Sequence, residues 1–176
     1  MADRSGTRNA LARIQRAVLE MSEFTDALLM LSREEHATRP SDADTELTPL
    51  LLRVVEDHRS VVPGKRIAVQ IDENNHSQIT APESMVAMVI GNIVRNALQH
   101  GTGTEVICKL QGRELTVANA GALPDVDLSR APLRRFSTRA GGHGMGLYLV
   151  RRICERYKWA VRLENAPGGV LATVGF

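Results

Sequence analysis

Two asparagines and a histidine recur at four-residue intervals in a largely apolar helical segment. Asn92 and Asn96 share one face of a helix that we predict between Pro82 and Gln99. His100 follows another four residues along. Asparagine is a mediocre helix former, so two in register need a reason. Their amide oxygens can ligate Mg²⁺ beside nucleotide phosphates, because hard cations accept neutral oxygen ligands. A pair of hydrogen-bonding surface amides explains the spacing equally well.

A second candidate site is a run of glycines at the start of a helix. Gly142, Gly144 and Gly146 alternate before Leu147. Alternate glycines let the backbone approach phosphate oxygens, and the helix N-terminus adds N–H groups and a favourable dipole. A flexible hinge explains the glycines about as often. The spacing is not that of a P-loop, because no Gly-Lys-Ser/Thr follows, nor that of a dinucleotide fold, because no long hydrophobic strand leads in.

These residues must be positioned by regular elements, which periodicity and helix-boundary residues predict. Helices are expected at Thr48–Ser60, Pro82–Gln99 and Gly144–Tyr157. Strands are expected at Lys65–Asp72, Gln78–Thr80, Glu105–Leu110, Glu114–Ala118, Trp159–Asn165 and Val170–Phe176. We therefore predict an α+β fold, a two-layer sandwich with a mostly antiparallel sheet.

A further helix is predicted from Asn9 to Arg33. Residues spaced alternately by three and four positions form its seam: Leu11, Ile14, Val18, Met21, Thr25 and Leu28. A lone helix cannot bury such a stripe, so a partner helix or a second copy of the chain is expected. The polar stretch from Glu34 to Thr45 is predicted to be a linker.

The composition excludes several classes of protein. The net charge of +2 comes from 22 basic and 20 acidic residues without a basic block, and aromatic residues make up only 3%, so nucleic acid is not the expected partner. Cys108 and Cys154 lack the spacing of a zinc site. The chain begins without an apolar signal sequence and contains no uninterrupted apolar run of 18 residues. We therefore expect the chain as given to be soluble and cytoplasmic.

Four short segments occur in a recognisable order. Asn92–Ala97 looks like an N box, Val117–Gly121 like a first G box, Leu133–Phe136 like an F box and Gly142–Leu147 like a second G box. Together they resemble the catalytic domain of bacterial sensor histidine kinases, in the ATPase superfamily shared with gyrase, Hsp90 and MutL. The resemblance covers about residues 47–176.

The resemblance implies a Bergerat-type ATP-binding fold with ATP and Mg²⁺ as cofactors. It implies that Asn96 ligates Mg²⁺ with assistance from Asn92, and that a lid between Ala120 and Gly141 folds over the nucleotide. The implied ATP-binding residues are Asn92, Asn96, His100, Asn119, Gly121, Arg135, Phe136, Arg139, Gly142, Gly144, Gly146 and Leu147. A solvated lid face is the alternative interpretation of the lid arginines.

Two positions depart from the family pattern. Asn119 stands where an aspartate normally accepts a hydrogen bond from the adenine amino group, and an amide oxygen can still accept that bond. Leu123 stands where the family has a further glycine, which would stiffen or reshape the lid hinge. We therefore expect modest affinity for ATP.

The resemblance also divides the chain. Residues 1–36 resemble a remnant of the dimerisation and phosphotransfer domain, residues 37–46 form the linker, and residues 47–176 form the ATP-binding catalytic domain. The helix that carries the phosphoacceptor histidine would lie upstream, because none of the five histidines has the required context. The full-length protein is expected to be a homodimer anchored in the inner membrane.

The expected function is that of a protein histidine kinase, represented by a fragment without its phosphoacceptor histidine. The γ-phosphoryl group of ATP would pass to that histidine and then to an aspartate in the receiver domain of a response regulator. Two alternatives stay open. One is a degenerate interaction module that does not respond to nucleotides, suggested by Asn119 and Leu123. The other is a protein serine kinase like the anti-sigma factors of this superfamily.

Overall fold

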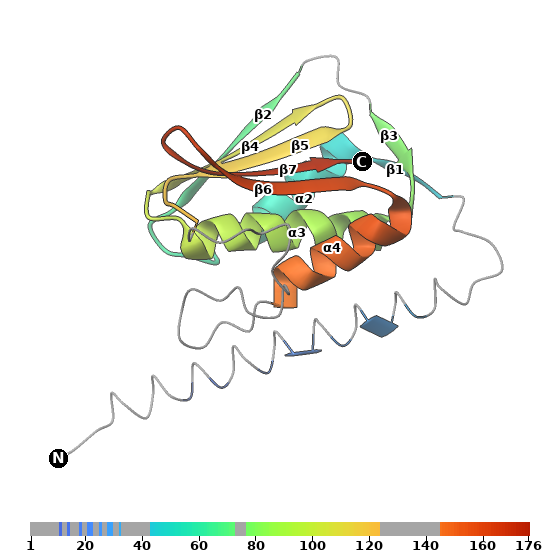
Figure 1. Ribbon diagram of the computed structural model, residues 1–176, viewed down its shortest axis with the longest axis horizontal. Coiled ribbons are helices and arrows are strands. Elements are labelled where there is room, and N and C mark those ends of the chain that lie inside the picture. Colours follow the sequence, from blue (N-terminus) through green and yellow to red (C-terminus); the bar gives the residue numbers. More distant parts are fainter. Residues whose placement is uncertain are drawn as a thin grey trace. The chain divides into compact units, whose positions relative to one another are not determined.

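The computed structural model describes residues 43–72, 77–123 and 145–176, together with nine positions near the N-terminus. The chain divides into two units, Met1–Arg39 and Pro40–Phe176. In the second unit the described elements follow in the order β1 (Asp44–Glu46), α2 (Leu47–His58), β2 (Arg66–Ile71), β3 (Gln78–Thr80), α3 (Glu83–His100), β4 (Glu105–Gln111), β5 (Glu114–Asn119), α4 (Met145–Tyr157), β6 (Ala160–Ala166) and β7 (Gly169–Gly175) (Figure 1).

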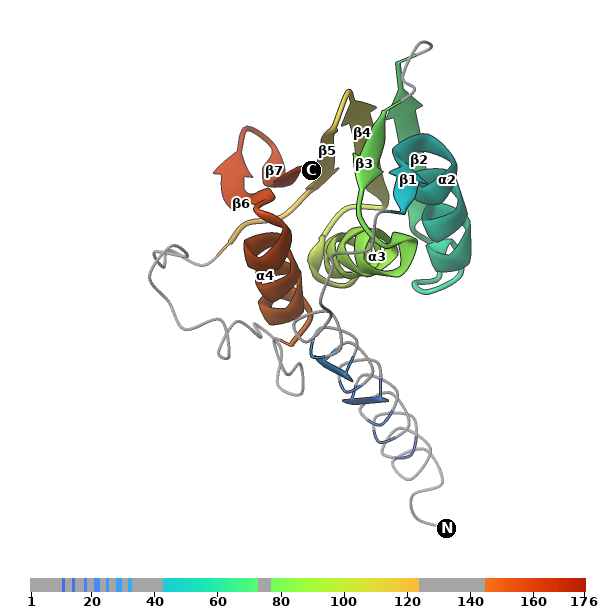
Figure 2. The same ribbon diagram turned by 90° about the vertical axis from the view of Figure 1, so that its right-hand side faces the viewer.

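The second unit is a sandwich of one sheet and one layer of helices. Five strands form the sheet in the order β2-β4-β5-β7-β6, in which β2 and β4 run parallel and the other neighbours antiparallel. Helices α2, α3 and α4 all cover the same face of this sheet (Figures 1 and 2). The predicted α+β two-layer architecture with a mostly antiparallel sheet is confirmed.

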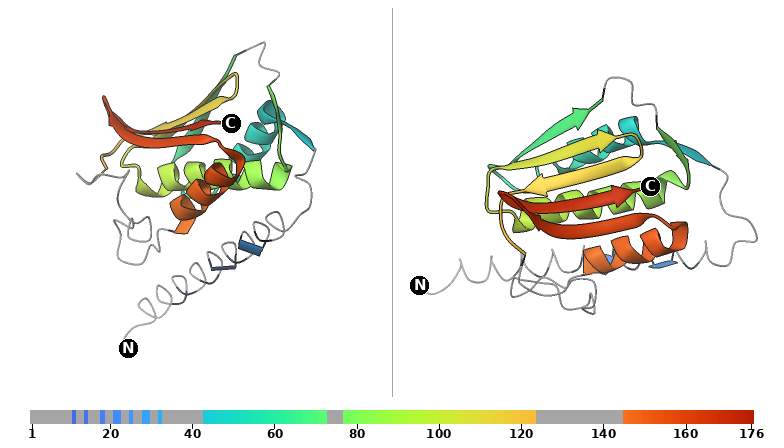
Figure 3. Two further views of the ribbon diagram at one scale, coloured as in Figure 1. Left: turned by 45° about the vertical axis from the view of Figure 1, so that its right-hand side comes forward. Right: turned by 45° about the horizontal axis from the view of Figure 1, so that its top comes forward.

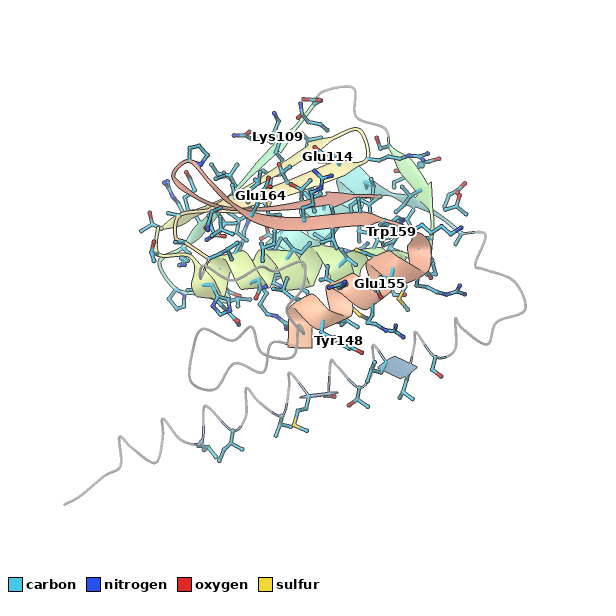
Figure 4. All side chains as sticks on the ribbon, viewed as in Figure 1. Lys109, Glu114, Tyr148, Glu155, Trp159 and Glu164 are labelled. Atoms are coloured by element: carbon cyan, nitrogen blue, oxygen red, sulfur yellow. The ribbon has the colours of Figure 1, made fainter. Side chains whose placement is uncertain are left out.

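Alternation along the strands explains why one face of the sheet is covered. Successive strand residues point to opposite faces, so every second side chain can enter the core. Figure 4 shows Lys109, Glu114 and Glu164 on the face away from the helices. The buried positions of the three central strands are Val106, Cys108 and Leu110 in β4, Leu115 and Val117 in β5, and Val170, Ala172 and Val174 in β7. The core therefore lies between these positions and the helices.

The long helix predicted from Pro82 to Gln99 is α3, which begins one residue later and ends one residue later. Ten of its residues are buried: Met85, Val86, Val89, Ile90, Gly91, Asn92, Ile93, Val94, Ala97 and Leu98. A helix that is apolar around so much of its circumference must be enclosed by other elements. The sheet and the two neighbouring helices enclose it.

One part of the predicted linker is instead a strand. Residues 44–46 form β1, which pairs antiparallel with β3 in a separate two-stranded sheet. The sequence had predicted one sheet for all the strands, and this pairing corrects that expectation because it places β3 outside the five-stranded sheet. Thr45 is buried in β1, and its hydroxyl donates a hydrogen bond to the carbonyl of Ala81 at 2.7 Å. This hydrogen bond holds β1 in place, although its composition is typical of a linker.

The first unit is described at Leu11, Ile14, Val18, Met21, Ser22, Thr25, Leu28, Leu29 and Ser32, and all nine residues are helical. The spacing had predicted a helix at these positions. The six apolar side chains among them are each between 40% and 60% exposed. A partner for this stripe stays a prediction. Within the described residues, no helix is both long enough and apolar enough to cross a membrane.

The two cysteine thiols lie in the core on opposite layers, Cys108 on β4 and Cys154 on α4. Burial raises the pKa of Cys108 to about 12. Burial also raises the pKa of Cys154 to about 12, with a smaller contribution from the carboxylate of Glu155. Both groups are therefore neutral thiols at physiological pH and poor nucleophiles.

We expect neither thiol of the folded protein to react with a disulfide reagent at pH 8, and both to react after unfolding in urea. In the unfolded chain the thiols lose their protons near the ordinary pKa of about 9, whereas in the folded chain they keep them up to about pH 12. The thiols' contribution to stability is therefore full below pH 9 and declines between about pH 9 and 12.

Urea unfolding at pH 8, 9 and 10 measures this decline. The double variant Cys108→Ala, Cys154→Ala serves as control, because its free energy of unfolding should fall less over the same range. Reaction of either thiol in the folded protein at the rate of free cysteine would contradict the burial of that thiol.

Candidate functional site

Helix α3 lies between α2 and α4 in the helical layer (Figure 2). Gly91 of α3 faces α2, and the next residue, Asn92, faces α4. A Cβ atom on Gly91 would stand 3.3 Å from Cε1 of His58 in α2. A Cβ atom on Gly146 of α4 would stand 2.7 Å from Oδ1 of Asn92. The first turn of α4 thus lies directly against the first asparagine of the predicted site.

The amide of Asn92 is buried, with only 9% of the residue exposed. Its Nδ2 donates a hydrogen bond to the carbonyl of Met88 at 2.8 Å. Its Oδ1 accepts a hydrogen bond from Nη2 of Arg95, also at 2.8 Å. A buried amide needs such partners, because an unsatisfied polar group in the interior costs about 1–3 kcal/mol. The two bonds fix the oxygen toward α4.

Asn96 lies one turn further along α3 and is half-buried. Within the described part of the chain its amide forms no hydrogen bond. Asn92, Asn96 and the exposed His100 occupy one polar edge of a largely buried helix, as the four-residue spacing predicted. Arg95 belongs to the same edge, and its contact with Asn92 was not anticipated from the sequence. The three-residue spacing between the two side chains was the available signal.

Asn119 closes the other end of this edge, where β5 meets the C-terminus of α3. Its Nδ2 donates to the carbonyl of Ala120 at 3.0 Å, and the same carbonyl accepts the backbone N–H of Thr102 at 2.8 Å. A Cβ atom on Gly101 would stand 3.1 Å from Asn119 Nδ2. From Asn92 to Gly101 the helix rises about 13 Å. This span suits an elongated ligand such as a nucleoside triphosphate.

The hairpin of β6 and β7 approaches the same point. A Cβ atom on Gly169 would stand 2.1 Å from the carbonyl oxygen of Asn119, so only glycine fits there. The backbone N–H of Leu123 donates to Oδ1 of Asn165 at 2.8 Å, which ties the start of the expected lid to β6. Neither Gly169 nor Asn165 was predicted as part of the site, because nothing in the local sequence marks them.

The other predicted residues divide into two groups. Gly121 adjoins the amide of Asn119, since a Cβ atom there would stand 3.6 Å from its Nδ2. Leu147 is half-buried in the first turn of α4, beside Gly146. Arg135, Phe136, Arg139, Gly142 and Gly144 lie outside the described residues. Their assignment to the site stays a prediction.

A comparison with known families decides what kind of domain this is. A family model described as "Histidine kinase-, DNA gyrase B-, and HSP90-like ATPase" matches residues 81–175. The chain belongs to this family of ATPases. The match spans α3, with both asparagines, and α4, with Gly146. The nucleotide of this ATPase domain is ATP.

Curated relatives include three bacterial kinases. The sensor-like histidine kinase SenX3 of Mycolicibacterium smegmatis is 24% identical over 161 residues, covering 84% of this chain and 42% of the relative. The sensor histidine kinase TrcS of Mycobacterium tuberculosis is 26% identical, with 92% and 35% covered. The sensor protein QseC of Salmonella typhimurium is 28% identical, with 95% and 39% covered. The chain thus spans about two fifths of the length of these relatives.

Solved structures share the fold. The cytoplasmic segment of histidine kinase QseC has a TM-score of 0.63 at 20% identity, with 100% of this chain and 96% of that chain covered. The mycobacterial sensor histidine kinase MprB also scores 0.63 at 20% identity, with 76% and 95% covered. Full-length ShkA in complex with AMPPNP scores 0.65 at 19% identity, with 99% and 39% covered.

Replacement of Gly146 by alanine tests the contact between α3 and α4. The added Cβ would stand 2.7 Å from Asn92 Oδ1, so the amide must rotate or a helix must shift. We expect this overpacking to destabilise the protein by about 1–3 kcal/mol, against about 1 kcal/mol gained from the better helix former. Urea unfolding followed by circular dichroism measures the difference.

Gly146→Ala should have a different effect on stability once Oδ1 of Asn92 has been removed. In an Asn92→Ala background we expect Gly146→Ala to be neutral or stabilising, a coupling that a double-mutant cycle detects. Gly175→Ala is the control, because its Cβ would meet Ala160 at an ordinary 3.8 Å. Equal effects of Gly146→Ala in both backgrounds would show that the contact with Asn92 Oδ1 does not cause the loss of stability.

Proposed function

We propose that this chain is the ATP-binding catalytic domain of a bacterial sensor histidine kinase. Its ATP would phosphorylate a histidine outside the chain, and the phosphoryl group would then pass to an aspartate of a response regulator. The observation that carries the proposal is the family match across α3 and α4, two helices that pack together through Asn92 and Gly146. The names of the curated relatives support the histidine as acceptor.

The proposed reaction is a phosphoryl transfer. An imidazole nitrogen of the acceptor histidine attacks the γ-phosphorus, a P–N bond forms, the bond to the β–γ bridging oxygen breaks, and ADP leaves. A carboxylate oxygen of the regulator then displaces the histidine in the same way. Catalysis of such transfers depends almost entirely on positioning and charge stabilisation. A site of amides, glycines and arginines suits this task without a protein nucleophile of its own.

The chemistry of the available donors fits Mg²⁺. Among the described residues, no group of three or more histidine, cysteine, aspartate or glutamate side chains could hold a metal ion. Mg²⁺ is commonly bound through substrate phosphates with only one or two protein ligands. The half-buried amide of Asn96 can supply one such oxygen. When bound, the ion neutralises the charge that develops on the phosphates.

The rest of the chain fits a two-component sensor. We assign residues 1–36 to a dimerisation helix, residues 37–46 to its connection and residues 47–176 to the ATP-binding domain. The exposed apolar stripe of the N-terminal helical positions supports a homodimer of the full-length protein. The likeness to the cytoplasmic segment of histidine kinase QseC supports a cytoplasmic location, with a membrane anchor elsewhere in the full-length protein.

One observation favours a second function, an interaction module that does not respond to nucleotides. Asn119 replaces the expected aspartate, and its amide nitrogen is hydrogen-bonded to the carbonyl of Ala120. This bond gives the side chain a structural role that needs no adenine. Nucleotide titration distinguishes the two functions.

We expect calorimetric titration with a non-hydrolysable ATP analogue to show binding that Mg²⁺ strengthens. Asn96→Ala should weaken binding about tenfold or more in the presence of Mg²⁺, which corresponds to about 1.4 kcal/mol. Without Mg²⁺ the variant and the wild type should bind alike, because the lost oxygen acts through the ion.

Gln70→Ala is the matched control. Gln70 is an exposed amide on β2, away from α3, and its loss should leave both affinities unchanged. If the wild-type protein binds no analogue at millimolar concentration, the interaction module becomes the better assignment.

A further inference from the structure

Arg95 is the only lysine or arginine in α3. It lies between the two asparagines of the polar edge and is half-buried, in a helix whose other central residues form the core. Its guanidinium group is a cation with N–H donors and no acceptor.

The hydrogen bond to Asn92 determines where this charge is held. Nη2 of Arg95 stands 2.8 Å from Asn92 Oδ1, and the same oxygen faces Gly146 in the first turn of α4. Since the amide nitrogen of Asn92 is bonded to the carbonyl of Met88, the amide cannot rotate without breaking both bonds. The guanidinium group is therefore held at the junction of α3 and α4 by a buried, fixed acceptor.

This arrangement changes the role expected of Asn92. A guanidinium group carries five N–H donors in a planar fork, so one arm can bond an amide while other arms contact anionic oxygens. An amide oxygen already bonded to a cation is a poor ligand for a second one, because the two positive charges repel each other at short range. The metal ligand among the two asparagines is then Asn96.

We infer that Arg95 binds the polyphosphate of the nucleotide directly and that Asn92 is a positioning residue for Arg95 and not a metal ligand. This inference rests on the proposed function, because it takes the polar edge of α3 as the nucleotide site. It assigns the two asparagines to different tasks, although their spacing makes them look equivalent. Charge-assisted bonds from arginine to phosphate are about twice as strong as neutral hydrogen bonds.

The test is the Mg²⁺ dependence of binding in three variants of the intact chain. We expect Arg95→Met to weaken binding of the ATP analogue about tenfold, with or without Mg²⁺. Asn92→Ala should weaken it about three- to tenfold, again in both conditions. Asn96→Ala should weaken it only when Mg²⁺ is present.

Two further readouts separate binding from a merely structural effect. Adenosine lacks phosphate, so its affinity, measured by NMR titration, should be the same for Arg95→Met and the wild type. The double variant Asn92→Ala, Arg95→Met should bind the analogue no worse than Arg95→Met alone, because Asn92 acts through Arg95. Arg113→Met, an equal charge change in the exposed turn between β4 and β5, controls for net charge.

The outcomes distinguish this inference from the proposed function. If the wild type binds no analogue, both fall. If the wild type binds and Arg95→Met binds equally well, the inference alone is overturned. It is also overturned if Asn92→Ala weakens binding only with Mg²⁺, because Asn92 would then be a metal ligand. Methionine preserves the apolar stem of arginine, and unchanged adenosine binding shows that the variant has folded.

Discussion

The enclosure of α3 by the sheet, α2 and α4 is the constraint on which the rest of the second unit depends. A helix buried on three sides must present small or apolar groups at its contacts, and any polar group that it buries must find partners nearby. Gly146 meets the first requirement where α4 crosses. Asn92 meets the second with bonds inside its own helix. Core packing and the candidate site are therefore built from the same contact.

Much of the fold could be predicted because its signals are local. The alternation of β4 and β5 and the glycine turn between them predicted a hairpin within one residue of the observed bounds. The partner of β3 could not be predicted, because β1 has three residues, too few to show a period, and its partners lie 32 to 36 positions away in the chain. Its composition is that of a linker, and the tertiary pairing overrides it.

The candidate site could also be predicted only in part. Helical spacing placed Asn92 and Asn96 together, because both belong to one element. The bond between Arg95 and Asn92 gives the two amides different surroundings, and spacing alone does not reveal this difference. Gly169 was missed because its neighbour is the backbone of Asn119, fifty positions earlier in the chain. Contacts of this kind depend on the register of β5 and β7, which no local pattern encodes.

The position of β7 within the sheet has a consequence for folding. It follows every other described strand in the chain, yet it lies between β5 and β6 rather than at an edge (Figure 3). During synthesis β5 therefore emerges long before its second neighbour, and its free edge remains open to pairing with other chains. Val174 of β7 belongs to the buried core, so part of the apolar face of the helical layer also stays exposed until β7 has joined the sheet. Aggregation of nascent or truncated chains, more than instability of the finished domain, is the hazard that this strand order creates.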